Sequence, residues 1–290
     1  MGPLDLVNLT PLMARTMGRA EIKIGLIDGP VAVDHPDLAG QNIHRIAGRE
    51  AGICSVPSSV ACLHGTFVAG MLSAKRSSIA AAICPGCTLL VRSIFAETVS
   101  TNGGMPSAMP EELASAIIDT VNAGARLINL SAAVVRPSAR GERELEEALS
   151  YAGKRNVIVV VAAGNQGTVG SSVISRHPWS IPVAACNLQG RLMAESNLGN
   201  SIGKYGLLAP GDEVTSLGTN GKPQISGGTS AAVPFVTGAA ALLWSEFPGA
   251  SATQIRLALM HAGGLRRRAI APPLLDAWAA YAAMESGRPQ

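Results

Sequence analysis

The sequence predicts an α/β protein with a mostly parallel central sheet and helices on both faces of that sheet. Short apolar runs alternate along the chain with longer segments of helical periodicity, and this order is typical of a parallel sheet with crossover helices. The run at 157–163 is apolar throughout, as expected for a parallel strand covered on both faces. The 290 residues, 47% of them hydrophobic and 15% charged, are enough for a substantial core.

The expected elements follow in chain order. Apolar runs bounded by Gly, Pro or polar residues indicate strands, and these cover residues 22–27, 88–95, 126–130, 157–163, 180–185 and 207–210. Apolar residues spaced by three and four indicate helices, and these cover residues 4–20 (short helix and turn), 64–72, 110–123, 142–154, 230–244, 251–261 and 273–284. Because no stretch has the composition of a linker, we expect a single domain over 1–290, with its core at about 4–284.

The stretch from Ser226 to Pro234 places a serine at the start of a buried helix. Small residues lead to Ser230, and the helix that follows is apolar almost all round, which is typical of a buried helix. A helix N-terminus presents free N–H groups and favours negative charge. We expect Pro234 in the first turn, where its missing N–H costs little. By itself, this stretch is equally consistent with a structural turn capped by Ser230.

Three other polar residues occupy comparable places. Asp28 ends the first predicted strand, His64 begins a predicted helix, and Asn165 follows the strand 157–163. Sites in such folds form at the carboxyl ends of the strands. Each residue has an ordinary structural interpretation. Together with Ser230, however, they supply a carboxylate, an imidazole, an amide donor and a hydroxyl.

These segments resemble the signature blocks of the subtilisin-like serine proteases, the subtilase (S8) family. The matching blocks are Asp28-Gly29, His35-Pro36-Asp37-Leu38, His64-Gly65-Thr66, Ala163-Gly164-Asn165 and Gly228-Thr229-Ser230-x-Ala232-x-Pro234. The resemblance covers nearly the whole chain and implies a subtilisin-like three-layer sandwich. It also implies that Ser230 is the nucleophile, that His64 is its base and that Asp28 orients the imidazole. Asn165 and the backbone N–H of Ser230 would form the oxyanion hole.

The resemblance further implies an extended peptide substrate that pairs with strand edges. The residues expected to bind it are Leu130, Ser131, Ala132, Ala163, Gly164, Arg176 and Gly228, with edges at 130–133 and 95–104. Relatives usually have a glycine soon after the serine that corresponds to Ser131, whereas Ala132-Ala133-Val134 follow here, which is expected to narrow the site. Arg176 falls near the floor of the pocket for the residue before the cut. An inward Arg176 would favour an acidic or small residue there, and an outward one implies nothing.

Other segments resemble the proteases that mature cyanobactin-type ribosomal peptides. They are Asp28-Gly29-Pro30-Val31, Ile83-Cys84-Pro85 and Ser93-Ile94-Phe95. This resemblance implies a serine endopeptidase that removes a leader from a specific precursor peptide. Two alternatives stay open. One is a macrocyclase of the same family, although no insertion of helical length stands near His64. The other is a peptide-binding protein without activity.

No cofactor or metal is expected. Ser77 stands where many subtilases have a calcium-binding asparagine, and Asp37 alone would be a poor calcium site. A further departure from the family is Phe67, which replaces a histidine common among relatives.

The charge and the ends of the chain suggest no nucleic-acid or membrane partner. The net charge is +3, and the short cluster Arg266-Arg267-Arg268 is typical of a solvated loop. No signal peptide, propeptide or membrane span is evident, so a cytoplasmic location is expected. The sequence does not indicate an oligomeric state.

The five cysteines leave three alternatives. In a reducing cytosol the default is buried thiols. A disulfide among Cys54, Cys62, Cys84 and Cys87 is the second possibility. A zinc site is the third, because Cys84-Pro85-Gly86-Cys87 has ligand spacing.

Overall fold

Seven strands form one sheet in this computed structural model, which describes all residues except 1, 51, 98–107, 132–138, 263–269 and 288–290. The strand order is β2-β3-β1-β4-β5-β6-β7, and every neighbouring pair is parallel. The strands are β1 (Lys23–Asp28), β2 (Ile43–Arg45), β3 (Thr88–Ser93), β4 (Leu127–Leu130), β5 (Ile158–Ala162), β6 (Ser180–Cys186) and β7 (Leu207–Pro210). The predicted parallel sheet is confirmed.

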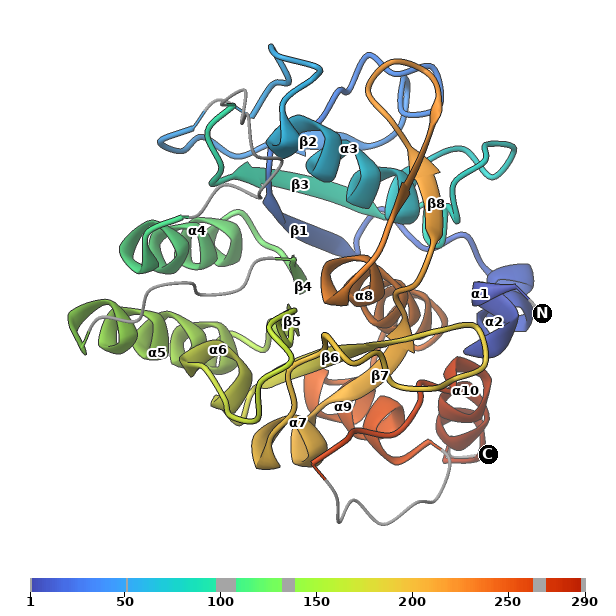
Figure 1. Cartoon of the computed structure of the whole chain (residues 1–290). Helices are drawn as coiled ribbons and strands as arrows, with labels where there is room; N and C mark the ends of the chain where they lie inside the picture. Colours follow the sequence, from blue (N-terminus) through green and yellow to red (C-terminus); the bar gives the residue numbers. More distant parts are fainter. Residues whose placement is uncertain (1, 51, 98–107, 132–138, 263–269, 288–290) are drawn as a thin grey trace.

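Helices cover both faces of the sheet (Figure 1). They are α1 (Pro3–Leu6), α2 (Leu9–Arg15), α3 (Val60–Ser73), α4 (Pro110–Asn122), α5 (Ala139–Lys154), α6 (Val173–Arg176), α7 (Asn200–Tyr205), α8 (Thr229–Glu246), α9 (Ala252–His261) and α10 (Ala277–Ser286). Successive strand residues point to opposite faces. Leu127 therefore joins the core that contains α3 and α8, and Ile128 joins the core under α4 and α5. Burial on both faces explains why the strands read as continuous apolar runs.

A small antiparallel hairpin lies beside α3 and was not predicted (Figure 1). It consists of β8 (Val214–Leu217) and β9 (Pro223–Ser226). The hydroxyl of Ser216 donates a hydrogen bond to the carbonyl of Phe67 in α3, at 2.7 Å. The strands are short, and β9 is partly exposed, so neither gives the apolar run by which a strand is recognised from sequence.

Three predicted helix starts were wrong, and one of them is that of α5, which begins at Ala139 rather than at residue 142. The helix expected to begin at His64 begins at Val60, where the side chain of Ser59 accepts a hydrogen bond from the Cys62 N–H. The helix expected from residue 273 begins at Ala277. Residues 273–275 are instead bonded to β7, because Leu208 donates to the carbonyl of Pro273 at 2.7 Å and accepts from Leu275 N at 2.8 Å.

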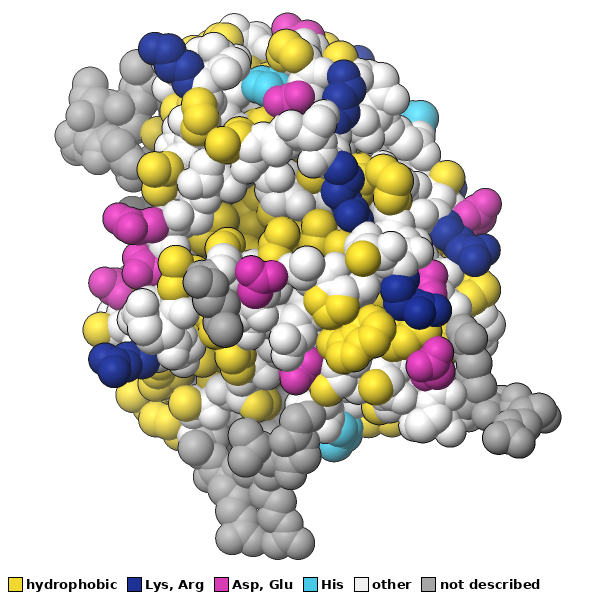
Figure 2. Space-filling model, turned by 90° about the vertical axis from the view of Figure 1, so that its right-hand side faces the viewer, with side chains coloured by type: hydrophobic (Ala, Val, Ile, Leu, Met, Phe, Trp, Pro, Cys, Tyr) yellow, Lys and Arg dark blue, Asp and Glu magenta, His cyan; other side chains and the backbone are white. Residues whose placement is uncertain are grey.

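On the face of the molecule shown in Figure 2, basic and acidic side chains are interspersed among hydrophobic and uncharged ones. The cluster Arg266-Arg267-Arg268 lies outside the described residues. Among the helices that the structure describes, none is both long enough and apolar enough to span a bilayer.

Two glycines bring α3 into backbone contact with the segment that follows β1. A Cβ on Gly65 would lie 2.5 Å from the carbonyl oxygens of Gly29 and Pro30, and a Cβ on Gly29 would overlap the carbonyl of Ala61. Only residues without a Cβ permit this approach. The contact therefore sets the distance between the end of β1 and α3.

We predict that Gly65→Ala destabilises the protein. Alanine in a helix interior stabilises a protein by up to about 1 kcal/mol relative to glycine. Overpacking a filled contact destabilises it by about 1–3 kcal/mol. The steric overlap is therefore expected to outweigh the gain in helix propensity. Urea unfolding would measure the change. The matched control is Gly249→Ala, since a Cβ there meets no atom within 4 Å. Equal stability of the two variants would contradict the prediction.

Candidate active site

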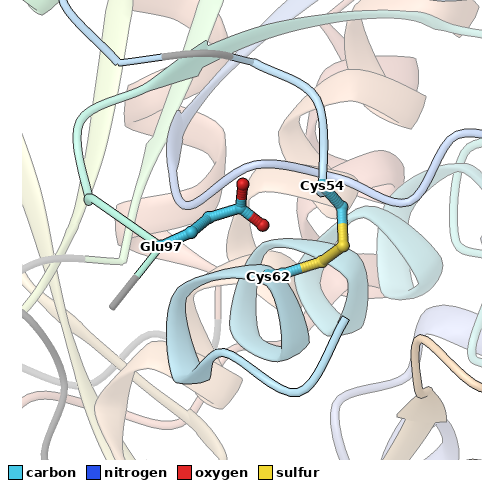
Figure 3. A group of neighbouring side chains, drawn as sticks. All are labelled: Cys54, Cys62 and Glu97. Atoms are coloured by element: carbon cyan, nitrogen blue, oxygen red, sulfur yellow. A yellow bond between two sulfur atoms is a disulfide. The ribbon is translucent and has the colours of Figure 1, made fainter. Parts of the chain in front are cut away.

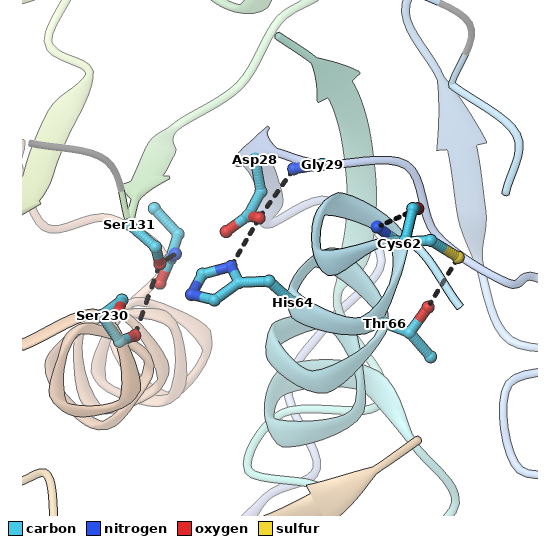
Figure 4. A network of polar contacts seen from close by, with 9 residues as sticks. Asp28, Gly29, Cys62, His64, Thr66, Ser131 and Ser230 are labelled. Carbon is cyan, nitrogen blue, oxygen red and sulfur yellow. Dashed lines mark hydrogen bonds and ion pairs between the residues drawn. The ribbon is translucent and has the colours of Figure 1, made fainter. Parts of the chain in front are cut away.

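Asp28 and His64 form a close pair at the carboxyl end of β1. Asp28 is the last residue of β1 and is fully buried. Its Oδ1 lies 2.7 Å from Nδ1 of His64 and also accepts the Gly29 N–H at 2.6 Å. Figure 4 shows the second ring nitrogen of His64 directed toward the N-terminal end of α8, where Ser230 lies. The carboxylate thus orients the ring and leaves the other nitrogen available.

The pKa of His64 is raised above its ordinary value of 6.5. Burial disfavours the charged ring and lowers the pKa, but the negative charge of Asp28 and its hydrogen bond outweigh burial. The Asp28 carboxylate therefore stabilises a protonated His64.

Ser230 is the second residue of α8, which begins at Thr229 after an N-cap at Gly228. Pro234 consequently lies in the second turn, and the expectation of the first turn was wrong. Because proline has no N–H, the carbonyl of Ser230 four residues earlier lacks its usual helical partner. The hydroxyl of Ser131 donates to that carbonyl at 3.4 Å. Pro234 therefore leaves the Ser230 carbonyl available for a tie to the end of β4.

A buried chain of hydrogen bonds supports this tie and was not foreseen. Asn129 in β4 donates through Nδ2 to Ser131 Oγ at 2.9 Å and accepts at Oδ1 from the hydroxyl of Thr237, also at 2.9 Å. Asn129 and Thr237 are completely buried. An asparagine within an apolar strand was the only sequence signal for this chain of contacts.

Asn165 follows β5, and its amide is oriented by Thr229. Its Oδ1 accepts from the backbone N–H of Thr229 at 2.8 Å and from the Thr229 hydroxyl at 2.9 Å. With Oδ1 occupied in this way, the NH₂ group is the part of the amide left to donate, and Asn165 lines the same pocket as Ser230. Gly228 permits the approach of Asn165, because a Cβ there would lie 2.8 Å from Asn165 Nδ2, and its φ of 87° favours glycine.

A pocket of about 370 Å³ brings these groups together. It is lined by Val60, Leu63, His64, Phe67, Asn165, Gln224, Ser226, Gly227 and Ser230. The structure thus joins three of the four residues singled out from sequence in one pocket, and Asp28 is reached through His64. The contributions of Val60, Leu63 and β9 were missed, since the short hairpin was not recognised.

The other expected substrate-binding residues are distributed as follows. Leu130 ends β4 and Ser131 follows it, and Ala163 and Gly164 follow β5. Ala132, and residues 98–104 of the second expected edge, lie outside the described residues. Arg176 ends α6, and its guanidinium is 3.3 Å from the carboxylate of Glu142 in α5. That pairing partly neutralises the charge on which the predicted preference for an acidic residue depends.

Cys54 and Cys62 form a disulfide beside this site (Figure 3). The default expectation of thiols is therefore wrong for this pair, whereas Cys84, Cys87 and Cys186 are buried free thiols. Among the described residues Cys54, Cys62 and Glu97 are the one group with ligand atoms close enough for a metal. Their two sulfur atoms are bonded to each other.

The disulfide is one of several ties on the described part of the loop before α3, which also forms a β-bridge between Ile53 and Val31. The carboxylate of Glu97 accepts the backbone N–H groups of Ser55 at 2.9 Å and Val56 at 2.8 Å. The hydroxyl of Thr219, between β8 and β9, donates to the Pro57 carbonyl at 2.6 Å. The loop is thereby fastened to the extension of β3 on one side and to the hairpin on the other.

A sequence profile of the peptidase S8, subtilase family, matches residues 19–272. The chain belongs to the subtilase family. It is 33% identical over 236 residues to a thermostable alkaline protease of Halalkalibacterium halodurans, a match that covers 81% of this chain and 60% of that protein. It is 31% identical over 246 residues to a thermophilic serine proteinase of Bacillus sp. strain AK1, covering 84% of this chain and 57% of that protein. This subtilase thus spans less than two thirds of the length of these relatives.

Solved structures confirm the subtilisin-like fold. The protease domain of PatA, solved as a point mutant, is 28% identical with a TM-score of 0.82, and the match covers 93% of this chain and 98% of that one. The prenylagaramide maturation protease PagA is 28% identical with a TM-score of 0.81, covering 95% and 98%. The predicted resemblance to cyanobactin maturation proteases is therefore confirmed. A PatG macrocyclase in complex with peptide, 22% identical with a TM-score of 0.79 and covering 94% of each chain, shares the fold.

Replacing Asp28 by Asn is expected to lower the pKa of His64, because burial remains while the negative charge is lost. The raised pKa means that the pair stabilises the fold below the unfolded pKa of histidine and that this contribution is lost as pH rises through the folded pKa. NMR titration of the His64 ring would measure the shift, with the other four histidines as internal references. An unchanged His64 pKa would contradict the assigned pairing.

Reduction of the Cys54–Cys62 disulfide is expected to destabilise the protein by about 2–3 kcal/mol. This is the loop-closure free energy expected for cysteines with a sequence separation of 8. Denaturant unfolding with and without a reductant measures this difference. The Cys54→Ser/Cys62→Ser double variant is the control, since the reductant should not affect it further. A reductant effect of equal size on both proteins would place the effect at another site.

Proposed function

We propose that this subtilase is a serine endopeptidase that cuts peptide bonds through an acyl-enzyme on Ser230. The observation that supports this most directly is the Asp28–His64 pair at 2.7 Å beside a pocket that Ser230 also lines. The pocket brings a nucleophile, a base and an oriented amide to one opening, which is the arrangement that acyl transfer requires.

In the proposed mechanism, Ser230 Oγ forms a bond to the scissile carbonyl carbon while its proton passes to Nε2 of His64. The imidazolium that forms is stabilised by Asp28, which keeps its own charge. The C–N bond then breaks, and His64 returns the proton to the leaving amine. Water repeats the sequence on the acyl-enzyme. No Ser230–His64 hydrogen bond occurs within the described part of the chain. Such contacts often tighten only when the substrate binds.

The proposed oxyanion hole consists of the Asn165 side-chain NH₂ and the backbone N–H of Ser230. The N–H lies in the first turn of α8, where backbone donors have no helical partner. Thr229 holds the Asn165 amide with its oxygen turned away. Donors fixed in advance stabilise the developing charge without reorganisation.

For the acyl part of the substrate, we propose an extended strand along the end of β4, where Ser131 lies, and the end of β5, where Ala163 and Gly164 lie. The hydrogen bond from Ser131 to the Ser230 carbonyl holds this edge at a set distance from the nucleophile. We propose that Arg176, together with its ion-pair partner Glu142, influences which substrate side chain is accepted before the cut.

We further propose that the substrate is a ribosomal precursor peptide from which a leader is removed. The similarity to the PatA protease domain and to the maturation protease PagA supports this. A cytoplasmic location is part of the same proposal. Because disulfides are rare in a reducing cytosol, thiol trapping of Cys54 and Cys62 in cell extracts would report on the compartment.

The test is mass spectrometry of a mixed peptide library incubated with the wild-type protein and with Ser230→Ala. Cleavage by the wild type alone, with products heavier by one water in sum, is the expected result. The residues before the cuts would show whether Arg176 matters, with Arg176→Gly as the comparison.

Other outcomes separate the alternatives. Cyclic products without added water would identify a macrocyclase. Labelling of Ser230 by a fluorophosphonate without library cleavage would indicate an active nucleophile restricted to a specific precursor. The absence of both cleavage and labelling would contradict the proposed hydrolase and favour a peptide-binding protein.

A further inference from the structure

One face of α3 lines the pocket beside Ser230. Val60, Leu63, His64 and Phe67 all contribute to the lining, and their spacing of three, four and seven residues places them on one side of a helix. Three of the four side chains are apolar. Phe67 is only 1% exposed and so belongs to the inner wall, whereas Val60 and Leu63 are partly exposed nearer the opening. The helix face that presents His64 is therefore otherwise hydrophobic.

The opposite wall comes from β9 and the segment after it. Gln224 and Ser226 line the pocket, whereas Ile225 between them is 61% exposed and does not, as the alternation of a strand requires. Gly227 adds backbone without a side chain. Among the residues that the structure describes, none that lines the pocket is Asp, Glu, Lys or Arg. A charged side chain entering here would lose water without gaining an ion partner.

The position of the pocket identifies which part of a substrate it would meet. The proposed acyl side runs along the ends of β4 and β5. No β4 residue lines this pocket, and Asn165 is the one described lining residue from the segment after β5. In the proposed mechanism His64 returns its proton to the leaving amine, so that amine lies next to the His64 ring. The residue that carries the amine then continues toward α3 and β9.

We propose that Val60, Leu63, Phe67 and Gln224 form a specificity pocket for the first residue after the cut and select an uncharged, apolar side chain there. This inference rests on the proposed function for the direction of the substrate. The volume of about 370 Å³ accommodates a side chain as large as leucine or phenylalanine. Burial of apolar surface favours such residues, and the missing counter-charge disfavours lysine and glutamate.

The experiment uses peptides that differ only in the residue after the cut, with Leu, Phe, Gln, Lys or Glu at that place. We expect kcat/KM to be roughly tenfold or more higher for Leu and Phe than for Lys and Glu. Leu63→Glu should reverse the order of Leu and Lys, because it places a carboxylate in the pocket. Ile225→Glu is the matched control, since it adds the same charge on the outer side of β9 and should keep the wild-type order.

A binding measurement makes the test independent of catalysis. The same peptides are titrated against full-length Ser230→Ala by fluorescence anisotropy, and the same preference is expected. Equal binding of all five peptides, no binding, or a preference that Leu63→Glu leaves unchanged would overturn the pocket assignment. Selective binding by Ser230→Ala, together with a wild type that cleaves none of the peptides, would overturn the proposed hydrolase and with it the placement of the pocket after the cut, but would keep the preference of the pocket for an apolar side chain.

Discussion

The backbone contact between α3 and the segment after β1 sets the geometry on which the site depends. Asp28 ends a buried strand, and His64 lies on a helix that approaches so closely that Gly65 has no room for a Cβ. This approach gives the 2.7 Å separation between the carboxylate and the ring. A hydrogen bond to a buried charge is strong, but only while both partners are held in place. The packing therefore maintains the raised pKa of His64.

The second half of the site depends on the start of α8. Gly228 allows Asn165 to approach, and Thr229 fixes the direction of the Asn165 amide through two hydrogen bonds. Pro234 removes one helical hydrogen bond and so leaves the Ser230 carbonyl free to accept from Ser131. Each deviation from a regular helix at this end makes a contact to β4 or to the segment after β5. Ser230, the proposed nucleophile, is consequently positioned by the sheet as well as by its own helix.

Helix α3 links the proposed chemistry to the proposed selectivity. The face that presents His64 also presents the apolar wall of the pocket, and the loop that leads into it is held by the disulfide, by Glu97 and by Thr219. The proposed base and the proposed wall for the leaving group thus belong to one helix. A side-chain change at Leu63 can alter the preference of the pocket while His64 keeps its contact with Asp28.

The sequence by itself predicted the parallel sheet and six of its seven strands. It also singled out Asp28, His64, Asn165 and Ser230 as candidate site residues. Buried strands and small-residue helix starts leave periodic, local signals in a sequence. Only the tertiary structure decided the Cys54–Cys62 pairing, the Asn129–Thr237 contact and the pocket between α3 and β9. The cysteines allowed several pairings, the polar contact joins residues far apart in the chain, and the hairpin strands are short, with β9 partly exposed. In each case the residues that meet are brought together by the packing of the fold, and no local pattern in the sequence encodes that packing.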